Sequence, residues 1–265
     1  MIFNLRWCEI HLKRNPKRVI FKFQHNSSWY RDDYREFKKM MGNNNDFPIK
    51  DNFPCVDDKN DDAGDTHSHY FLQDLYVAQK IFENKPEKHV DVGSSINGFV
   101  GHVASFREIE VLDIRKMESK IKNVVFKQAD VMDNKKIPTD YCDSVSSLHA
   151  LEHFGLGRYG DPIDPEGHLK GFNNITKMLK VGGVFYFSVP MGRQRIDFNA
   201  HRVFGMPYLM NLVSKNYDIV SFAYIEDKGI LHKDVELKDN LIKSSFGCNL
   251  GCAIFELRKK DVSNG

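Results

Sequence analysis

One short run rich in glycine and serine offers the clearest chemistry in this sequence: Asp91-Val92-Gly93-Ser94-Ser95-Ile96-Asn97-Gly98. It follows residues 89–92, which are typical of a buried strand, and precedes a segment expected to be helical. Glycines let the backbone approach a ligand, and hydroxyl groups with the free amides of a helix start can bond a carboxylate or phosphate. The run predicts a ligand-binding loop, although an ordinary tight turn has a similar composition.

Acidic residues stand at the ends of the next two expected strands. Asp113 lies 20 residues beyond Gly93, where a carboxylate can accept both hydroxyl groups of a ribose. Asp130 follows the third strand, from which it can reach an adenine amino group. Each aspartate alone would more often be a helix cap. Together with the loop, they predict a nucleotide-type cofactor.

The segment from His149 to His168 combines glycines, prolines and charges at the end of a fourth strand, as a substrate-binding loop would. A long surface connection is the plainer alternative. Arg158, beside Tyr159, can bind an anionic group through two parallel hydrogen bonds. Arg195 and Arg202 follow the fifth strand and are expected to converge on the same edge of the sheet.

Histidine is the side chain best matched to proton transfer near neutral pH. His153 is therefore the first candidate for a general base, with Glu152 beside it, and His201 is the second. Any single histidine is more often structural.

The elements that must position these residues alternate along the chain. A helix with one apolar face is expected from about residue 70 to Asn84, and strands at about 89–92, 110–114, 124–128, 144–148, 184–189, 218–224 and 252–257, with a further helix at 165–179. Alternating strands and helices indicate a parallel α/β sheet. Residues 1–65 are polar and linker-like, so we predict an N-terminal extension followed by one Rossmann-like domain over 66–260.

Composition narrows the function classes. Among 265 residues, 38 Lys and Arg balance 36 Asp and Glu, so the net charge of +2 gives no reason to expect nucleic acid as a partner. Apolar runs are of strand length, and the amino terminus lacks a sustained apolar region, so we expect no membrane span and a cytoplasmic protein. Five scattered cysteines have no zinc-site spacing, which favours reduced thiols, although Cys248 and Cys252 could form half of a site.

The successive motifs HVDVGSSINGF, IEVLDIR, FKQADVMD, DSVSSLHALEHF and ITKMLKVGGVFYFSVP resemble those of class I S-adenosylmethionine (SAM)-dependent methyltransferases, over about residues 89–190. The stretch from His69 to about Leu257, with HALEHFGLGRYGDPIDPEGHLKGF and NAHRVF, also resembles a narrower group known only as a domain of unknown function.

The resemblance implies a Rossmann-like fold, SAM as cofactor and a site assembled from several loops. It places the cofactor's methionine part beside Gly93, Ser94, Ser95 and Asn97. It places the ribose at Asp113 and Ile114, and the adenine at Asp130 and Val131. His149 and Leu151 would close over the cofactor. The expected acceptor is a small polar or anionic molecule, such as a sugar or nucleotide-linked intermediate in carbohydrate biosynthesis.

Two other classes of function stay open. The serines of the first loop replace a glycine of the family's pattern, which suits a binding module without catalysis. His149-Ala150-Leu151-Glu152-His153 spells the His-x-x-Glu-His pattern of some zinc hydrolases, which requires both histidines on one helix. The pairs His67 with His69 and Asp161 with Asp164 could bind a divalent ion. No metal is expected in the main interpretation.

Overall fold

The computed structural model describes residues 28–42, 46–50, 54–56, 58–61, 63–64 and 66–261, and the chain divides into two units, Met1–Gly64 and Asp65–Gly265. Within the first unit, helix α2 (Ser28–Met41) buries none of its side chains. The ammonium group of Lys59 lies 4.1 Å from the ring centre of Trp29. Cys8 falls outside the described residues. None of the described helices is long and apolar enough to cross a membrane.

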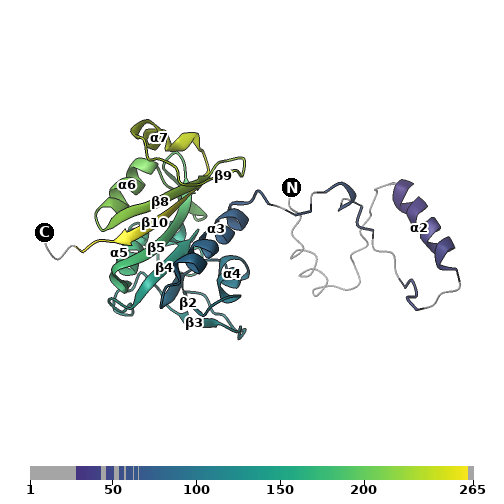
Figure 1. Cartoon of the computed structure of the whole chain (residues 1–265), viewed down its shortest axis with the longest axis horizontal. Coiled ribbons are helices and arrows are strands. Elements are labelled where there is room, and N and C mark those ends of the chain that lie inside the picture. The colour runs from purple at the N-terminus through teal and green to yellow at the C-terminus, as the bar shows by residue number, and fades with distance from the viewer. Residues whose placement is uncertain are drawn as a thin grey trace. The chain divides into compact units, whose positions relative to one another are not determined.

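The second unit is built on an eight-stranded sheet with the order β3-β2-β1-β4-β5-β10-β8-β9 (Figure 1). Its strands are β1 (His89–Val92), β2 (Ile109–Asp113), β3 (Val124–Gln128), β4 (Cys142–Leu148), β5 (Leu179–Met191), β8 (Tyr217–Ile225), β9 (Leu231–His232) and β10 (Gly251–Lys259). Strands β1 to β5 run parallel, whereas β10 is antiparallel to both β5 and β8. The chain proceeds from β1 outward to β3 and then returns to β4 on the other side of β1, so the strand order reverses there.

Helices cover both faces of the sheet (Figure 1). On one face, α3 (His69–Asn84) and α4 (Gly101–Ala104) pack in one apolar cluster with residues such as Ile109, Leu148 and Ile254. On the other, α5 (Gly167–Met178) and α6 (Met206–Ser214) pack in a second cluster around Phe185, Phe187 and Phe255. The remaining helix, α7 (Asp239–Lys243), is short. The predicted α/β fold is confirmed.

Local interactions set both ends of helix α3. The Ser68 hydroxyl accepts a hydrogen bond from the N–H of Phe71 at 3.2 Å and so caps the first turn. Lys85 takes a left-handed conformation just before Pro86, which cannot continue the helix.

The helix expected after the first loop is much shorter than its sequence suggested. A single π-helical turn, Ile96–Val100, leads into the four-residue α4. Gly98 has non-helical backbone angles, and a Cβ there would lie 2.3 Å from Oδ2 of Asp74. A side chain at position 98 would clash with Asp74 of α3, so the interrupted turn requires glycine there.

A hairpin that the sequence pattern did not predict follows β5. It consists of β6 (Arg195–Asp197) and β7 (His201–Val203), which pair only with each other as a two-stranded sheet. Strands of three residues are too short to show an alternating pattern.

Asp91 of β1 is fully buried and accepts three hydrogen bonds, from the amide and hydroxyl of Ser94 and the hydroxyl of Ser146. Burial nevertheless raises the pKa of Asp91 to about 7. Because the folded state then holds this proton more tightly than the unfolded state, its contribution to stability is present below about pH 4 and is lost as the pH rises to about 7.

We therefore expect the free energy of unfolding of the wild type, relative to Asp91→Asn, to fall by about 1 kcal/mol per pH unit between pH 5 and 7. Urea denaturation of both proteins measures this difference and cancels the titration of all other groups. A difference that is independent of pH would contradict a protonated Asp91.

Candidate functional site

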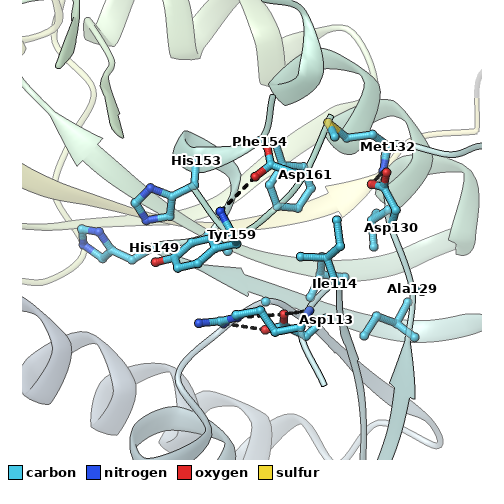
Figure 2. Close-up of a pocket in the computed structure, with 16 residues that line it drawn as sticks. Asp113, Ile114, Ala129, Asp130, Met132, His149, His153, Phe154, Tyr159 and Asp161 are labelled. Atoms are coloured by element: carbon cyan, nitrogen blue, oxygen red, sulfur yellow. Dashed lines mark hydrogen bonds and ion pairs between the residues drawn. The ribbon is translucent and has the colours of Figure 1, made fainter. Parts of the chain in front are cut away.

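A pocket opens at the carboxyl ends of β1, β2, β3 and β4, where the strand order reverses (Figure 2). Parallel α/β sheets place their ligands at such a reversal. Sixteen residues line it: Val92, Gly93, Leu112, Asp113, Ile114, Arg115, Ala129, Asp130, Val131, Met132, His149, Ala150, His153, Phe154, Tyr159 and Asp161. Eight of the residues predicted from the sequence are among them.

Asp113 ends β2 and is engaged by Arg115. The Arg115 guanidinium donates to both carboxylate oxygens, through Nε at 3.0 Å and Nη2 at 2.6 Å, and the Arg115 amide donates at 2.8 Å. The same guanidinium lies 4.4 Å from the ring centre of Tyr159. A ligand hydroxyl must therefore compete with Arg115 for Asp113.

The first loop is shaped by internal bonds. Gly93 lines the pocket with φ of +73°, and a Cβ there would lie 3.0 Å from the Cβ of Ala150. The Ser94 hydroxyl donates to Asp91 and accepts from the amide of Leu148 at 3.0 Å, so it joins β1 to β4. Ser95 donates to Asn97 at 2.9 Å. None of Ser94, Ser95 and Asn97 lines the pocket.

The end of β3 supplies a largely apolar wall. Val131 is buried, and its carbonyl accepts from the Asn174 side chain at 2.8 Å. Asp130 accepts from the amide of Met132 at 2.9 Å, which leaves its second oxygen for a ligand. With Ile114, these residues form a slot whose apolar sides and carboxylate edge suit a planar, hydrogen-bonding ring.

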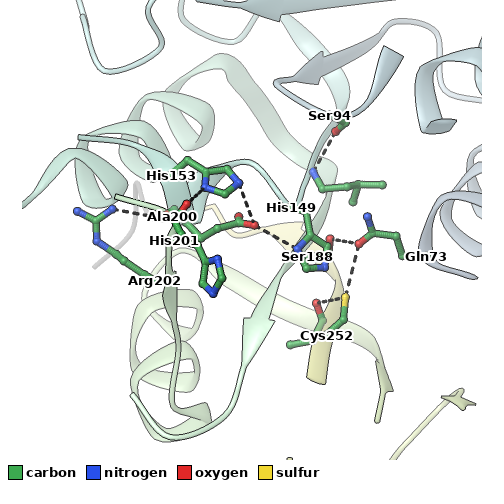
Figure 3. A network of polar contacts seen from close by, with 12 residues as sticks. Gln73, Ser94, His149, His153, Ser188, Ala200, His201, Arg202 and Cys252 are labelled. Carbon is green, nitrogen blue, oxygen red and sulfur yellow. Dashed lines mark hydrogen bonds and ion pairs between the residues drawn. The ribbon is translucent and has the colours of Figure 1, made fainter. Parts of the chain in front are cut away.

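His149, Glu152 and His153 form one polar group beyond β4 (Figure 3). Nδ1 of His149 lies 3.1 Å and Nε2 of His153 lies 3.6 Å from the same oxygen of Glu152. Burial disfavours the charged forms of both His149 and Glu152. The contacts with Cys252 and Glu152 nevertheless hold the pKa of His149 well above its usual value. His149 in turn lowers the pKa of Glu152. His149 and Glu152 are thus an ion pair.

His153 is neutral by contrast, because burial lowers its pKa. Its Nδ1 lies 2.6 Å from the carbonyl oxygen of Ala200, which can only accept, so Nδ1 carries the proton and Nε2 keeps its lone pair. The imidazole that lines the pocket is therefore in a form that can take up a proton.

The loop beyond His153 is organised by Asp161. Its carboxylate accepts from the amides of Gly155 and Gly157, at 2.8 and 3.1 Å, and from that of Tyr159 at 3.2 Å. These bonds direct Tyr159 over the pocket, with its ring edge-on to His153 (Figure 2). Arg158 is exposed beside it and donates to the carbonyl of Ala200 at 2.9 Å.

Several predicted site residues lie outside this pocket. Leu151 and Glu152 are buried behind it, and His201 lies 3.5 Å from Asp197 on the β6–β7 hairpin. Arg195 and Arg202 line a different cavity. Arg202 does meet the predicted loop, through the carbonyls of Glu152, Phe154 and Pro165, but neither arginine lines the pocket at the strand reversal.

The zinc alternative does not fit the geometry. Leu151–His153 is a single 3-10 turn, so the two histidines do not share a helical face. Across residues 66–261 and the other described segments, no group of three or more His, Cys, Asp or Glu side chains is arranged to hold a metal ion. Asp161 is committed to backbone amides and Asp164 to Lys170.

Sequence reasoning missed Arg115, Met132 and Phe154 as pocket residues. Arg115 carried a usable signal, since it stands two residues after a strand-end aspartate, the spacing at which a side chain folds back onto a carboxylate. Met132 and Phe154 are apolar residues in irregular segments, which no pattern distinguishes from core residues.

Solved structures resemble this chain in fold. A 1,6-didemethyltoxoflavin-N1-methyltransferase from Burkholderia thailandensis, with bound 1,6-didemethyltoxoflavin and S-adenosylhomocysteine, is 14% identical, with 72% of this chain and 80% of that chain covered and a TM-score of 0.51. The N-methyltransferase NodS from Bradyrhizobium japonicum, in complex with S-adenosylhomocysteine, is also 14% identical, with 76% and 90% covered and a TM-score of 0.50. The [4+2]-cyclase SpnF matches at 15% identity, with 71% and 80% covered and a TM-score of 0.50.

At such identities the likeness establishes the fold and not the reaction. No curated protein matches the sequence significantly. The family model described as "Caenorhabditis protein of unknown function, DUF268" matches residues 92–250, which is more than half of the chain. The chain therefore belongs to the DUF268 family and has the α/β fold of class I methyltransferases.

Proposed function

We propose that this protein is a SAM-dependent methyltransferase acting on a small polar or anionic acceptor. The observation that carries the proposal is the pocket at the strand reversal, which combines the Asp113 carboxylate with an apolar slot ending at Asp130. Two neighbours of the same fold hold S-adenosylhomocysteine, which supports this cofactor class.

The residues present fit the cofactor. Asp113 would accept the ribose hydroxyl groups, and the slot formed by Ile114, Asp130 and Val131 would hold the adenine. Gly93 and His149, which both line the pocket, would face the methionine part. Bound SAM would supply an electrophilic methyl group.

The chain's own residues would prepare the acceptor. His153 would take a hydroxyl proton at Nε2, and the Glu152 carboxylate 3.6 Å away would stabilise the resulting imidazolium. Tyr159 would exclude water by covering the pocket. Arg158, an exposed neighbour of Tyr159, would attract an anionic acceptor such as a sugar phosphate or a nucleotide-linked sugar.

Calorimetric titration with SAM and S-adenosylhomocysteine tests the proposal directly. We expect both to bind in the micromolar range, with one site per chain, because the pocket buries a planar ring and offers a free carboxylate edge. NAD is the matched control, since it shares the adenosine but not the methionine part. Absence of binding by SAM and S-adenosylhomocysteine would refute the cofactor assignment.

One observation favours a second candidate, a binding module without catalysis. Arg115 already neutralises Asp113, so the ribose position is engaged by the protein itself. If the protein is such a binding module, neither SAM nor S-adenosylhomocysteine binds. The calorimetric titration therefore distinguishes the methyltransferase from the binding module.

A further inference from the structure

A second cavity lies between the start of α5, the β6–β7 hairpin and the start of α6. Nine residues line it: Pro165, His168, Gln194, Arg195, Ile196, Arg202, Val203, Phe204 and Tyr208. It shares no lining residue with the pocket at the strand reversal. Most of its walls are apolar, and polar groups are concentrated at the two arginines and Gln194.

Arg202 is the unusual member of this cavity. This residue is only 4% exposed, and its guanidinium donates to three backbone carbonyls, those of Glu152 at 3.3 Å, Phe154 at 2.6 Å and Pro165 at 3.1 Å. A guanidinium has five N–H groups, so these bonds leave donors over. Charged side chains are rarely buried unless an opposite charge accompanies them.

No carboxylate in the described part of the chain forms an ion pair with Arg202. The nearby acids are used elsewhere: Asp161 by backbone amides and Asp164 by Lys170. Arg195 is already balanced by Asp197 at 3.1 Å. The positive charge in the cavity wall is therefore in direct contact only with backbone carbonyls, whereas Asp161 and Asp164 act on it from a greater distance.

The other titratable group in the wall does not change this balance. Burial and the charge of Arg202 lower the pKa of His168 to about 4, so it is neutral, and its Nε2 is bonded to the Tyr208 hydroxyl at 2.7 Å. The starts of α5 and α6 add the positive ends of two helix dipoles to the same side. An occupant with one carboxylate and an apolar body suits this lining.

We propose that this cavity is a second small-molecule site that binds an apolar monocarboxylate. The planar carboxylate would lie against the remaining N–H groups of Arg202, with its charge matched one to one. The hydrocarbon part would pack among Ile196, Phe204 and Tyr208. The site is separate from the cofactor pocket and does not depend on the proposed methyl transfer.

Phenylacetate is a suitable probe, and phenylacetamide is its uncharged counterpart. In the full chain with ¹³C-labelled valine methyl groups, we expect phenylacetate to shift the resonances of Val203, which is buried in the cavity wall. We expect phenylacetamide to bind at least about tenfold more weakly, because it leaves the charge of Arg202 unmatched. Equal affinities, or shifts elsewhere than at Val203, would overturn the proposal.

Charge variants of the exposed hairpin test the position without disturbing the core. Ile196, 55% exposed at the rim, changed to Asp should weaken phenylacetate binding about tenfold, since it brings a second negative charge to the cavity. Phe198→Asp is the matched control, because Phe198 is 75% exposed on the same hairpin and does not line the cavity. Equal effects of the two variants would overturn the assignment.

Arg202→Lys tests the donor itself, with thermal unfolding as the check on folding. A folded variant should lose at least about tenfold in phenylacetate affinity, because a lysine cannot reproduce the planar fork. Inorganic phosphate is expected to compete poorly, and tighter binding of phosphate than of phenylacetate would overturn the choice of ligand class.

Discussion

Replacing His153 with alanine is expected to lower the rate of methyl transfer by about 10²–10⁴-fold and to leave the affinity for S-adenosylhomocysteine nearly unchanged. The imidazole lines the pocket, and burial keeps it neutral. The bond from Nδ1 to the Ala200 carbonyl directs the lone pair to Nε2, so the ring is prepared to accept a proton. Transfer of a radiolabelled methyl group to an acceptor found by screening measures the rate, and calorimetry measures the affinity.

Two further variants decide between a base and a structural role for this residue. His153→Gln keeps a similar volume and can still donate to Ala200, so it should fold normally but lose the rate. His201→Ala removes the other candidate base, which lies outside the pocket beside Asp197. A rate lost in His201→Ala and kept in His153→Ala would move the base to His201. Loss of cofactor affinity together with the rate would mean that His153 supports the pocket.

The sheet was predictable because short strand-like segments alternate with helical ones along the chain. The five residues of β2 are all buried, as are the four of β1, and both were expected within one residue of their observed bounds. Helix α3 could also be predicted, because its apolar stripe and its end before Pro86 are local properties of the sequence. The interruption at Gly98 could not be predicted from the sequence, since it involves the close approach of Asp74 from another helix.

The strand-end residues of the site follow from topology. Asp113 and Asp130 line one pocket because the carboxyl ends of neighbouring parallel strands meet at one edge. Residues after the last parallel strand obey no such rule. The β6–β7 hairpin carries Arg202 to a separate cavity, and its path depends on contacts with the carbonyls of Glu152, Phe154 and Pro165 that sequence spacing does not encode.

Ser94 of the first loop has a structural role. It stands at a variable position of the family's Gly-x-Gly-x-Gly pattern, and its hydroxyl joins Asp91 to the amide of Leu148 and stays out of the pocket. Gly93, which lines the pocket, keeps the left-handed conformation that favours glycine. Ser94 therefore stabilises the loop from behind, while Gly93 faces the pocket.

Asp113→Ala is expected to weaken S-adenosylhomocysteine binding by about 10- to 150-fold, because it removes the carboxylate that would accept hydrogen bonds from two ribose hydroxyl groups. Calorimetry on the folded variant measures the change. The matched control is Arg115→Ala, which breaks the same ion pair but leaves the carboxylate in place. Since the Arg115 guanidinium occupies both Asp113 oxygens, its removal frees them, and we expect this variant to bind as tightly as the wild type or more so. If the two variants weakened binding equally, the ion pair rather than a ribose contact would account for the loss. An unchanged dissociation constant in Asp113→Ala would place the ribose elsewhere.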